Sequence, residues 1–329
     1  MKNESFWDKL LELNILVIGD LMLDKYIYGQ VERISPEAPV PILNVLREEN
    51  RAGGAANVAM NLLALGIKTT ICGVIGKDFQ GLGLIELLIK QGFNTETILP
   101  ITNRITTTKT RIIAQHQQML RIDNETTTPL QPTESIEFAK KIIMALETKP
   151  DAIILEDYDK GLLNKELIQT LVKEANRLNI PAFVDPKFKH FFDYEDVTVF
   201  KPNLKELKQA LNLSFSNTDM LAIQDAIEQL RKKMPHKITL VTMNQNGVLV
   251  CAENEEFTHI PAHIRKIVDV SGAGDTVIAV MAAGLVSKLT VVQATALANL
   301  AGGLVCEKVG VVPIDKAELM IEAKNEQLF

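Results

Sequence analysis

Two glycine-rich segments, far apart in the chain, carry the residues best suited to chemistry. The first, residues 269–275, reads DVSGAGD and leads directly into the apolar stretch 276–285, which we expect to form a buried helix. Backbone N–H groups at a helix N-terminus lack partners within the helix and lie at the positive end of its dipole. The segment therefore predicts an anion site built from the amides of Gly272, Ala273 and Gly274.

Asp275 stands at the edge of this predicted anion site. Its carboxylate could accept the proton of a hydroxyl that attacks a phosphoryl group. Phosphoryl transfer depends mainly on positioning and on stabilisation of negative charge, so backbone amides and one carboxylate supply much of what it needs. An ordinary glycine turn capped by an aspartate would look the same, because a short Gly-x-Gly pattern is common.

The second segment shifts the balance between these two interpretations. Residues 53–61 read GGAANVAMN and open a helix of small and apolar residues that ends at Gly66. Gly53 and Gly54 allow the backbone to approach a ligand closely, and Asn57 offers both a donor and an acceptor. The two motifs together are far more specific than either one alone.

The bulk composition limits the class of protein. The chain has 329 residues, 47% of them apolar and 23% charged, with a net charge of −6 and a sequence pI near 5.5. This composition is ordinary for a globular protein with one large α/β domain, and it offers no electrostatic footprint for nucleic acid. Cys72, Cys251 and Cys306 lie far apart and form no disulfide framework, which predicts a reducing compartment.

No segment predicts export, membrane insertion or a structural metal site. Residues 1–9 carry charges throughout and lack an apolar core, so we expect a cytoplasmic protein. The longest charge-free stretch, 289–306, contains polar residues and glycines and is short for a membrane span. His259 and His263 are four residues apart, but Pro261 between them argues against a shared helical face for a metal.

Apolar runs and amphipathic patterns alternate along the chain. Strands are expected at 15–18, 69–75, 152–155, 182–185, 197–200 and 238–241, and helices at 82–91, 134–146, 165–178, 204–211 and 219–233. This alternation favours a mostly parallel sheet with helices on both faces. Antiparallel strands are expected near the end of the sheet at 247–251 and 256–260, and two helices close the chain. Residues 1–329 are expected to form a single domain.

Two segments depart from this pattern. Residues 26–51 combine strand-forming residues with Pro36, Pro39 and Pro41, which predicts exposed strands that leave the main sheet. The threonine-rich segment 104–123 predicts a second excursion of the same kind. Together they would form a small β lid, and exposed strand edges of this kind invite pairing with another chain.

Polar residues follow several of the predicted strands directly. In open α/β sheets, ligands bind beyond the carboxyl ends of the strands. The residues that fall at such ends are Asp20, Glu156, Asp157, Asp185 and Asn203. We therefore expect a ligand site along this edge of the sheet.

The two motifs and this architecture resemble the ribokinase-like (PfkB) carbohydrate kinases over nearly the whole chain. The family's Gly-Gly-x-x-Asn motif is matched by Gly53, Gly54 and Asn57. Its signature Asp-Thr-x-Gly-Ala-Gly-Asp is matched by residues 269–275, with Val270 in place of the usual threonine, a departure that leaves the base and the anion hole untouched. The resemblance implies a ribokinase-like α/β fold with a small β-strand lid, and ATP as the phosphoryl donor.

The resemblance also implies roles for individual residues. Asp275 would take the proton from a sugar hydroxyl, and the amides of Gly272, Ala273 and Gly274 would stabilise the transferred group. The substrate-binding residues would be Asp20, Asp24, Gly53, Gly54, Asn57, Glu156, Asp157, Lys160 and Lys187. Asp20 and Asp24 could each cap a turn instead.

The nucleotide side of the site is implied by further matches. The family's Asn-x-x-Glu motif, linked to Mg²⁺ and phosphate placement, is matched by Asn203 and Glu206, which would act through water. The same spacing fits a helix N-cap with a capping-box glutamate, and both roles can hold at once. The remaining matches are Gly247 and Asn299 on the nucleotide side, and Asp269 and Ser271 as oxygen donors to a monovalent cation such as K⁺.

A narrower similarity is to the family members that phosphorylate D-glycero-β-D-manno-heptose 7-phosphate at its 1-hydroxyl, on the ADP-heptose route to the lipopolysaccharide core. The segments that carry it are 19–26, 33–41, 53–59, 157–161 and 185–187. Many such kinases are fused to a nucleotidylyltransferase. The chain contains no H-x-G-H-type nucleotide-transfer motif, so the resemblance implies a stand-alone kinase.

A phosphorylated substrate needs a cationic pocket for its own phosphate. The sequence does not choose among the candidates Arg33, Arg104, Lys109, Arg111, Lys160 and Lys187. Lids in this family often pair between subunits, so the resemblance implies a homodimer.

Other functions fit less well. A different sugar kinase is the nearest alternative, although residues 33–41 argue against it, and a non-catalytic sugar-binding regulator would not need an intact Asp275. A dinucleotide-dependent oxidoreductase would carry G-x-G-x-x-G after the first strand, where GDLM stands instead. No P-loop motif is present, and Ser271 lacks the G-x-S-x-G context of a nucleophilic serine.

Overall fold

A nine-stranded sheet forms the centre of the molecule, which a computed structural model describes over residues 6–115, 117–253, 256–263 and 265–328. Its strands follow the order β13 (Thr258–Ile260), β12 (Val248–Ala252), β11 (Ile238–Thr242), β10 (Val199–Phe200), β9 (Ala182–Asp185), β8 (Ala152–Glu156), β1 (Asn14–Gly19), β4 (Lys68–Gly76) and β5 (Ile98–Ile101). Strands from β11 to β5 are parallel, and β12 and β13 are antiparallel. The prediction of a mostly parallel sheet is confirmed.

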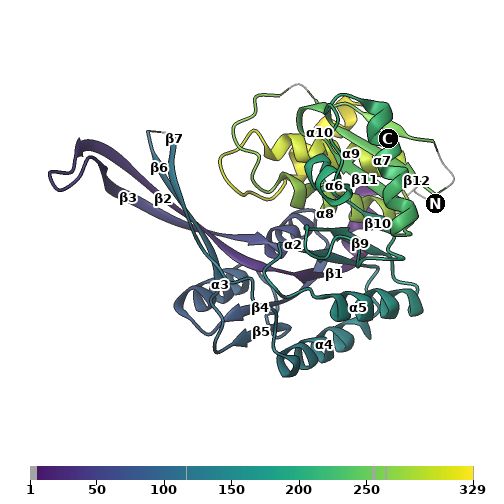
Figure 1. The fold of residues 1–329 in the computed structure, drawn as a ribbon, viewed down its shortest axis with the longest axis horizontal. Coiled ribbons are helices and arrows are strands. Elements are labelled where there is room, and N and C mark those ends of the chain that lie inside the picture. The colour runs from purple at the N-terminus through teal and green to yellow at the C-terminus, as the bar shows by residue number, and fades with distance from the viewer. Residues whose placement is uncertain (1–5, 116, 254–255, 264, 329) are drawn as a thin grey trace.

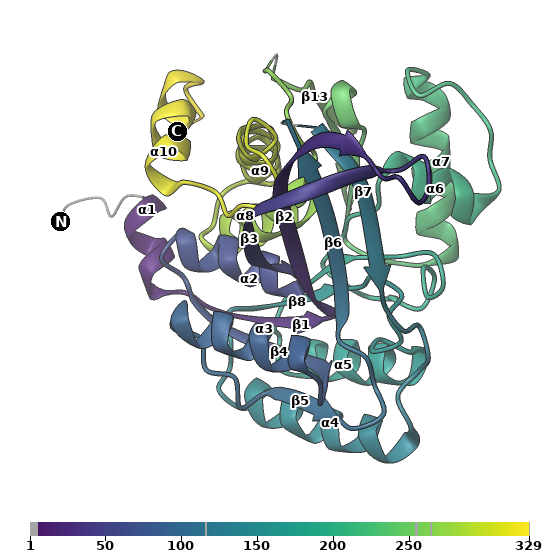
Figure 2. The same ribbon diagram turned by 90° about the vertical axis from the view of Figure 1, so that its left-hand side faces the viewer.

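Helices cover both faces of this sheet (Figures 1 and 2), because its strands present apolar side chains on both sides. In β1, Ile15 and Val17 enter one core, and Leu16 and Ile18 enter the other. The first core packs against α2 (Ala55–Ala64), α3 (Phe79–Lys90), α8 (Ala273–Val286), α9 (Val291–Val305) and α10 (Lys316–Asn325). The second packs against α4 (Pro132–Leu146), α5 (Lys165–Arg177), α6 (Leu204–Leu211) and α7 (Met220–Lys233).

The C-terminal helices differ in how clearly the sequence predicts them. Helix α8 carries apolar or small residues nearly all round and is buried along most of its length, as expected for 276–285. Two helices were expected to close the chain, but the structure contains a third, α10, of whose residues only Leu319 and Ala323 are buried. Such a narrow apolar stripe gives little periodic signal. The chain begins, within the described residues, with α1 (Phe6–Lys9) and a 3₁₀ turn at Leu10–Glu12.

A second sheet of four strands, here called the lid sheet, projects away from the body of the molecule (Figure 1). Its strands follow the order β3 (Pro41–Gly54), β2 (Leu21–Ile34), β6 (Thr107–Ala114) and β7 (Gln117–Asn124). Strands β2 and β3 extend beyond the excursion expected at 26–51. The sequence did not reveal their inner ends as part of the lid, because these ends are buried and resemble strands of the main sheet. Outer residues such as Ile34 and Leu46 are exposed.

Among the described residues, no helix combines the length and the apolar character needed to cross a membrane. The expectation of a cytoplasmic protein depends partly on residues 1–5, which lie outside the described part of the chain.

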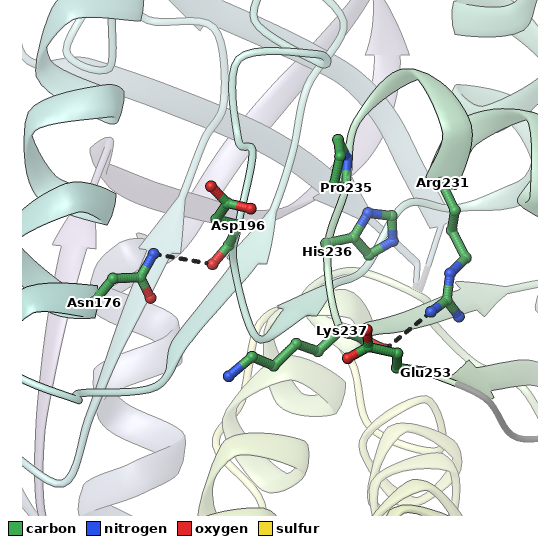
Figure 3. A pocket seen from close by; sticks show the side chains of 7 residues that line it. All are labelled: Asn176, Asp196, Arg231, Pro235, His236, Lys237 and Glu253. Atoms are coloured by element: carbon green, nitrogen blue, oxygen red, sulfur yellow. Dashed lines mark hydrogen bonds between the residues drawn. The ribbon is translucent and has the colours of Figure 1, made fainter.

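A cavity of about 480 Å³ lies at the amino ends of β10 and β11, away from the predicted ligand edge (Figure 3). Arg231 on its wall donates to the carbonyls of Cys251 and Ala252. His236 Nδ1 lies 2.7 Å from the Met234 carbonyl oxygen, and His236 Nε2 lies 2.6 Å from the Thr239 hydroxyl oxygen. A neutral ring satisfies both contacts, by donating from one nitrogen and accepting at the other.

Stability should fall in mild acid because of His236. Burial lowers the pKa of this imidazole from 6.5 to about 4. Between these two pH values the imidazole binds a proton in the unfolded chain but stays neutral in the folded chain. The stabilisation is fully present above pH 6.5 and is lost as the pH falls toward 4, by on the order of 3 kcal/mol. Urea unfolding of wild type and His236→Asn at pH 7.0 and 4.5 should show a smaller pH effect in the variant. Parallel profiles would contradict this account.

Candidate active site

A cavity of about 600 Å³ opens at the carboxyl edge of the main sheet, where the sequence places the ligand site. It is bounded by the loops that follow β8, β9 and β11 and by the N-terminal turn of α8. The predicted site residues that line it are Lys187, Asn203, Gly247, Gly272, Ala273, Gly274, Asp275 and Asn299. The cavity thus brings the turn before α8 together with the residues predicted on the nucleotide side, whereas Gly53, Gly54 and Asn57 are not part of its lining.

Asp275 lies in the first turn of α8 and is 3% exposed. Its Oδ2 accepts a hydrogen bond from Asn57 Nδ2 at 2.8 Å, and its Oδ1 accepts one from the Tyr158 hydroxyl at 2.7 Å. Burial raises the pKa of this carboxyl from 3.8 to about 6, although both hydrogen bonds oppose the shift. The group is thus held in one orientation and titrates close to neutral pH, as a general base requires.

The turn before α8 needs glycine for geometric reasons. Gly272 is the N-cap, with φ at +82°, and a Cβ there would lie 2.7 Å from Asn57 Nδ2. The absence of a side chain therefore lets the α8 turn pack directly against α2. The Ala273 amide donates to the Val270 carbonyl at 3.3 Å, a long bond that leaves this amide only weakly engaged.

Asn57 joins the two glycine motifs. It lies in the first turn of α2 and donates to Asp275 across 218 positions of sequence. Asn61, one turn later, donates to the Asn57 carbonyl at 2.8 Å and accepts from the Thr276 hydroxyl at 3.0 Å. The contact between α2 and α8 is thus made by buried polar groups that satisfy one another.

Gly53 and Gly54 end β3 where it meets the start of β2. A Cβ on Gly53 would collide with the Asp24 carboxylate, and one on Gly54 would collide with the Asp20 carbonyl. Gly54 also has φ at +60° and ψ at −134°, a conformation that is essentially restricted to glycine. The paired glycines therefore bring the backbone close to the two aspartates predicted to hold a sugar.

Asp20 is the residue at which the chain passes from β1 into the lid sheet. Its Oδ2 accepts from the amides of Tyr158 at 2.8 Å and Lys160 at 3.0 Å. Its Oδ1 is buried and has no hydrogen-bond partner within the part of the chain that the structure describes. Burial raises its pKa despite these amides. The turn-capping role is confirmed by these bonds, and one oxygen remains for a ligand.

Asp24 lies beside Asp20 at the root of the lid sheet and is 2% exposed. It forms an ion pair with Arg111 of β6, whose guanidinium also lies over the Tyr26 ring at 5.2 Å. Burial raises the pKa of Asp24, whereas the pKa of Arg111 is raised by Asp24 in spite of burial. Burial disfavours the charged form of both groups, and the ion pair between them opposes this effect in each.

Tyr158 was not assigned a role from the sequence, although it lies within the segment 157–161. Its hydroxyl contacts Asp275, and the Lys187 ammonium lies 5.1 Å from the centre of its ring. A tyrosine directly after two acidic residues at a strand end is a weak signal, because nothing in the spacing shows which way its ring turns. Asp157 turns away from Asp275 instead and accepts from the Tyr194 hydroxyl at 2.8 Å.

Asn203 and Glu206 form the capping box of α6, so that alternative is confirmed. Asn203 Oδ1 accepts from the Glu206 amide at 2.9 Å, and Glu206 Oε2 accepts from the Asn203 amide at 2.8 Å. The other Glu206 oxygen pairs with Lys187 at 2.9 Å. The two motif residues are thus already bonded to protein, and Lys187 lies on this side of the cavity.

The remaining predicted residues hold loops in place. Asp269 accepts from the amides of Ser271 and Gly310, both at 2.9 Å, and so ties the turn before α8 to the 309–311 loop. Asn299 donates to the Pro261 carbonyl at 2.9 Å. Gly247 has φ at +80°, which favours glycine, and lines the cavity beside β12.

Glu156 and Asp185 are the last residues of β8 and β9 and are register partners in the sheet. Asp185 pairs with Lys201 at 2.6 Å, a buried lysine that the sequence did not single out. Burial, together with Asp185 and Asp275, raises the pKa of Glu156 well above its usual range. The three acidic side chains are thus brought together at one point of the sheet edge.

Comparison with known proteins finds carbohydrate kinases and proteins related to them. The sequence model for "pfkB family carbohydrate kinase" matches residues 12–317. The bifunctional protein HldE of Methylobacillus flagellatus is 45% identical over 95% of this chain and 64% of its own length. HldE of Magnetococcus marinus is 44% identical over 93% of this chain and 63% of its own length. The chain thus spans less than two thirds of these relatives.

Solved structures with the same fold include two kinases. Phosphofructokinase-2 from Escherichia coli in complex with potassium superposes with a TM-score of 0.78 at 17% identity, covering 96% of this chain and 99% of that one. Ribokinase from Arabidopsis thaliana, complexed with ribose and ATP, gives 0.71 at 18% identity, covering 94% and 98%. These likenesses establish the ribokinase-like fold predicted from the sequence.

Proposed function

This chain belongs to the pfkB family of carbohydrate kinases, and we propose that it phosphorylates the 1-hydroxyl of D-glycero-β-D-manno-heptose 7-phosphate with ATP. The reaction gives the 1,7-bisphosphate, an intermediate for ADP-heptose and the lipopolysaccharide core, in the cytoplasm. The similarity of residues 33–41 and 157–161 to heptose phosphate kinases supports this substrate. The main structural support for the chemistry is the contact between Asn57 and Asp275, which joins the two motifs at one carboxylate.

Asp275 acts as the base in this proposal. Asn57 and Tyr158 fix its two oxygens, so the carboxylate meets the sugar hydroxyl in a set orientation. The γ-phosphate lies against the turn formed by Gly272, Ala273 and Gly274, where the α8 dipole favours negative charge. The sugar hydroxyls are held by Asp20, Asp24 and the Gly53–Gly54 backbone.

The cavity beside α8 binds the nucleotide, with Gly247 and Asn299 on its wall. Mg²⁺ bound together with ATP would neutralise part of the negative charge of the phosphates. Asn203 and Glu206 fit this role through water only, since their oxygens already accept protein hydrogen bonds. For K⁺, Asp269 and Ser271 are the proposed residues, because the Asp269 carboxylate holds the loop that leads into α8.

The substrate's own phosphate is proposed to bind Lys109 and Lys160. Both ammonium groups converge on Glu125 Oε2, at 3.4 and 2.8 Å, and both side chains are largely buried. Lys109 is the register partner of Asp24, and the Lys160 amide bonds Asp20, so the pair borders the sugar site. The other candidates have different partners or lie far from the sugar site: Arg111 pairs with Asp24, Arg104 donates to the Thr128 and Lys160 carbonyls, Lys187 pairs with Glu206, and Arg33 lies on the exposed outer lid. Lys109 and Lys160 are also paired, with Glu125 and, for Lys109, with Asp123 at 3.4 Å, so the proposal rests on their place beside Asp20 and Asp24.

The lid sheet is proposed to pair two copies of the chain. Its exposed apolar side chains include Val45 and Leu46 of β3 and Met119, Leu120 and Ile122 of β7, the two edge strands of this sheet. Several large apolar side chains exposed on sheet edges are unusual in a monomer. Light scattering should report a dimer for wild type and a monomer for Leu46→Lys combined with Leu120→Lys. A wild-type monomer at working concentration would exclude this arrangement.

A substrate panel tests the proposed reaction directly. Heptose 7-phosphate, unphosphorylated heptose, fructose 6-phosphate, fructose 1-phosphate and ribose would each be incubated with MgATP, and ADP release measured. We expect selective turnover of heptose 7-phosphate, with KM raised for Lys109→Met and Lys160→Met and not for Lys173→Met on α5. Preference for another sugar would refute the heptose assignment. Sugar binding without any turnover would instead favour a regulator built on the same fold.

A further inference from the structure

Glu125 contacts both of the lysines proposed to bind the substrate's phosphate. Its Oε2 lies 2.8 Å from the Lys160 ammonium and 3.4 Å from the Lys109 ammonium. The two lysines come from segments far apart in the chain, the loop after β8 and strand β6. Two ammonium groups around one anionic oxygen is an arrangement that a phosphate oxygen could also accept.

The carboxylate is more exposed than the two cations that it binds. The side chains of Lys109 and Lys160 are 15% and 12% exposed, whereas that of Glu125 is 28% exposed. Burial alone would raise the pKa of the Glu125 carboxyl, but hydrogen bonds and charge from Lys160 and Lys109 lower it. Glu125 is therefore ionised at neutral pH and supplies negative charge to two largely buried cations.

Both lysines lie beside the aspartates proposed to hold the sugar. The Lys160 amide donates to Asp20 at 3.0 Å, and Lys109 is the register partner of Asp24. Burial raises the pKa of each aspartate, and Lys160 opposes this rise in Asp20 as Lys109 does in Asp24. An anion bound between the two ammonium groups would thus lie next to a sugar bound at Asp20 and Asp24.

The acid is held less firmly than the two lysines. Lys109 belongs to β6, which is paired on both sides, with β2 and with β7. Lys160 lies in a loop that its own amide ties to Asp20. Glu125 is the first residue after the edge strand β7, in a segment, 125–131, that forms neither helix nor strand. Of the three groups, the carboxylate can therefore move away at the least cost in backbone hydrogen bonds.

We propose that Glu125 occupies the place of the substrate's phosphate in the ligand-free protein and releases both lysines when that phosphate binds. The exchange replaces one anion by another, so the two largely buried lysines keep a counter-charge throughout. A sugar without a phosphate carries no group that could replace the carboxylate. The inference rests on the proposed function for the identity of the phosphate, and it makes Glu125 a competitor of that phosphate.

Calorimetric titration of the nucleotide-free protein with heptose 7-phosphate tests this role. Glu125→Gln should bind the ligand about fivefold more tightly than wild type or better, because the neutral amide competes weakly for the lysines. Unphosphorylated heptose should bind wild type and variant alike. Asp123→Asn, which removes a carboxylate 3.4 Å from the same Lys109 ammonium, is the matched control and should have a much smaller effect.

Two results of this titration would overturn the proposal. Equal tightening in Glu125→Gln and Asp123→Asn would reduce the effect to a general change in local charge. Unchanged or weaker binding in Glu125→Gln would mean that the carboxylate only orders the lysines and that phosphate binds without displacing it.

Inorganic phosphate, as a second probe, makes the test independent of the sugar. Glu125→Gln should bind it more tightly than wild type, and adding Lys160→Met to this variant should abolish the gain. Such a gain without turnover of heptose 7-phosphate would refute the proposed function and leave the role of Glu125 standing. Selective turnover of heptose 7-phosphate by wild type, with no gain for either probe in Glu125→Gln, would refute the role of Glu125 alone.

Discussion

Replacing Asp275 with asparagine is expected to lower kcat by about 10³-fold or more, because the amide cannot take the proton from the attacking hydroxyl. The side chain keeps its shape, and the Tyr158 hydroxyl can still donate to its oxygen. With a pKa of about 6, the wild-type carboxylate is mostly ionised at pH 7 and ready to accept a proton. Steady-state rates with MgATP and the best sugar of the panel measure the effect.

The control for this variant is an aspartate that only caps a helix. Asp219 is the exposed N-cap of α7 and accepts from the Ala222 amide at 3.1 Å, so Asp219→Asn removes a helix-terminal charge away from the cavity. ATP affinity should be similar in wild type and both variants. If Asp275→Asn kept activity within tenfold of wild type, Asp275 would be a structural cap and the base would have to lie elsewhere.

The parts of the site that depend on backbone conformation were predictable from the sequence. Gly272 and Gly54 take positive φ angles, and their place in the chain marks turns that few other residues could form. The contact between the two glycine motifs does not follow from the strand-end rule, because Gly53 and Gly54 end β3 of the lid sheet and Gly272 follows a loop after the antiparallel strand β13. The sequence indicated that the two motifs belong together, and the structure adds that Asn57 and Asp275 are in contact.

Side-chain direction at the strand ends was not predictable in the same way. Glu156, Asp157 and Tyr158 are consecutive, yet the first faces Asp185, the second Tyr194 and the third Asp275. A strand alternates its side chains only while it remains extended, and β8 ends at Glu156. The direction of the next two residues depends on hydrogen bonds from the loop to Asp20, which no local pattern reveals.

The lid boundaries show a second limit. Leu21, Met22 and Leu23 are as apolar as the core of the main sheet and are buried. Local hydrophobicity cannot tell a strand of the main sheet from the inner end of a strand that leaves it, since both bury their side chains. The short edge strand β5 was missed for a related reason, because four residues that include Pro100 give almost no periodic signal.

Replacing Arg111 with methionine is expected to lower the free energy of unfolding by about 3–5 kcal/mol, because it leaves the Asp24 carboxylate buried without its cation. Burial raises the pKa of Asp24, and Arg111 opposes this shift. Without Arg111, the carboxylate would bind a proton more readily and would lose the negative charge proposed to hold the sugar. Urea unfolding at pH 7 measures the loss, with Arg121→Met on the exposed strand β7 as the control.

The double variant Asp24→Leu/Arg111→Met separates the stabilising role of this pair from its role in binding. Apolar side chains of similar volume often replace a buried ion pair at little cost, so the double variant should recover most of the lost stability. It should not recover the KM for the sugar, because the oxygens proposed to hold its hydroxyls are gone. A double variant that is stable and binds the sugar normally would show that Asp24 and Arg111 only hold the root of the lid sheet together. Stability regained without sugar affinity would place Asp24 in the binding site, and would explain why a costly charge pair stands where an apolar one would fit.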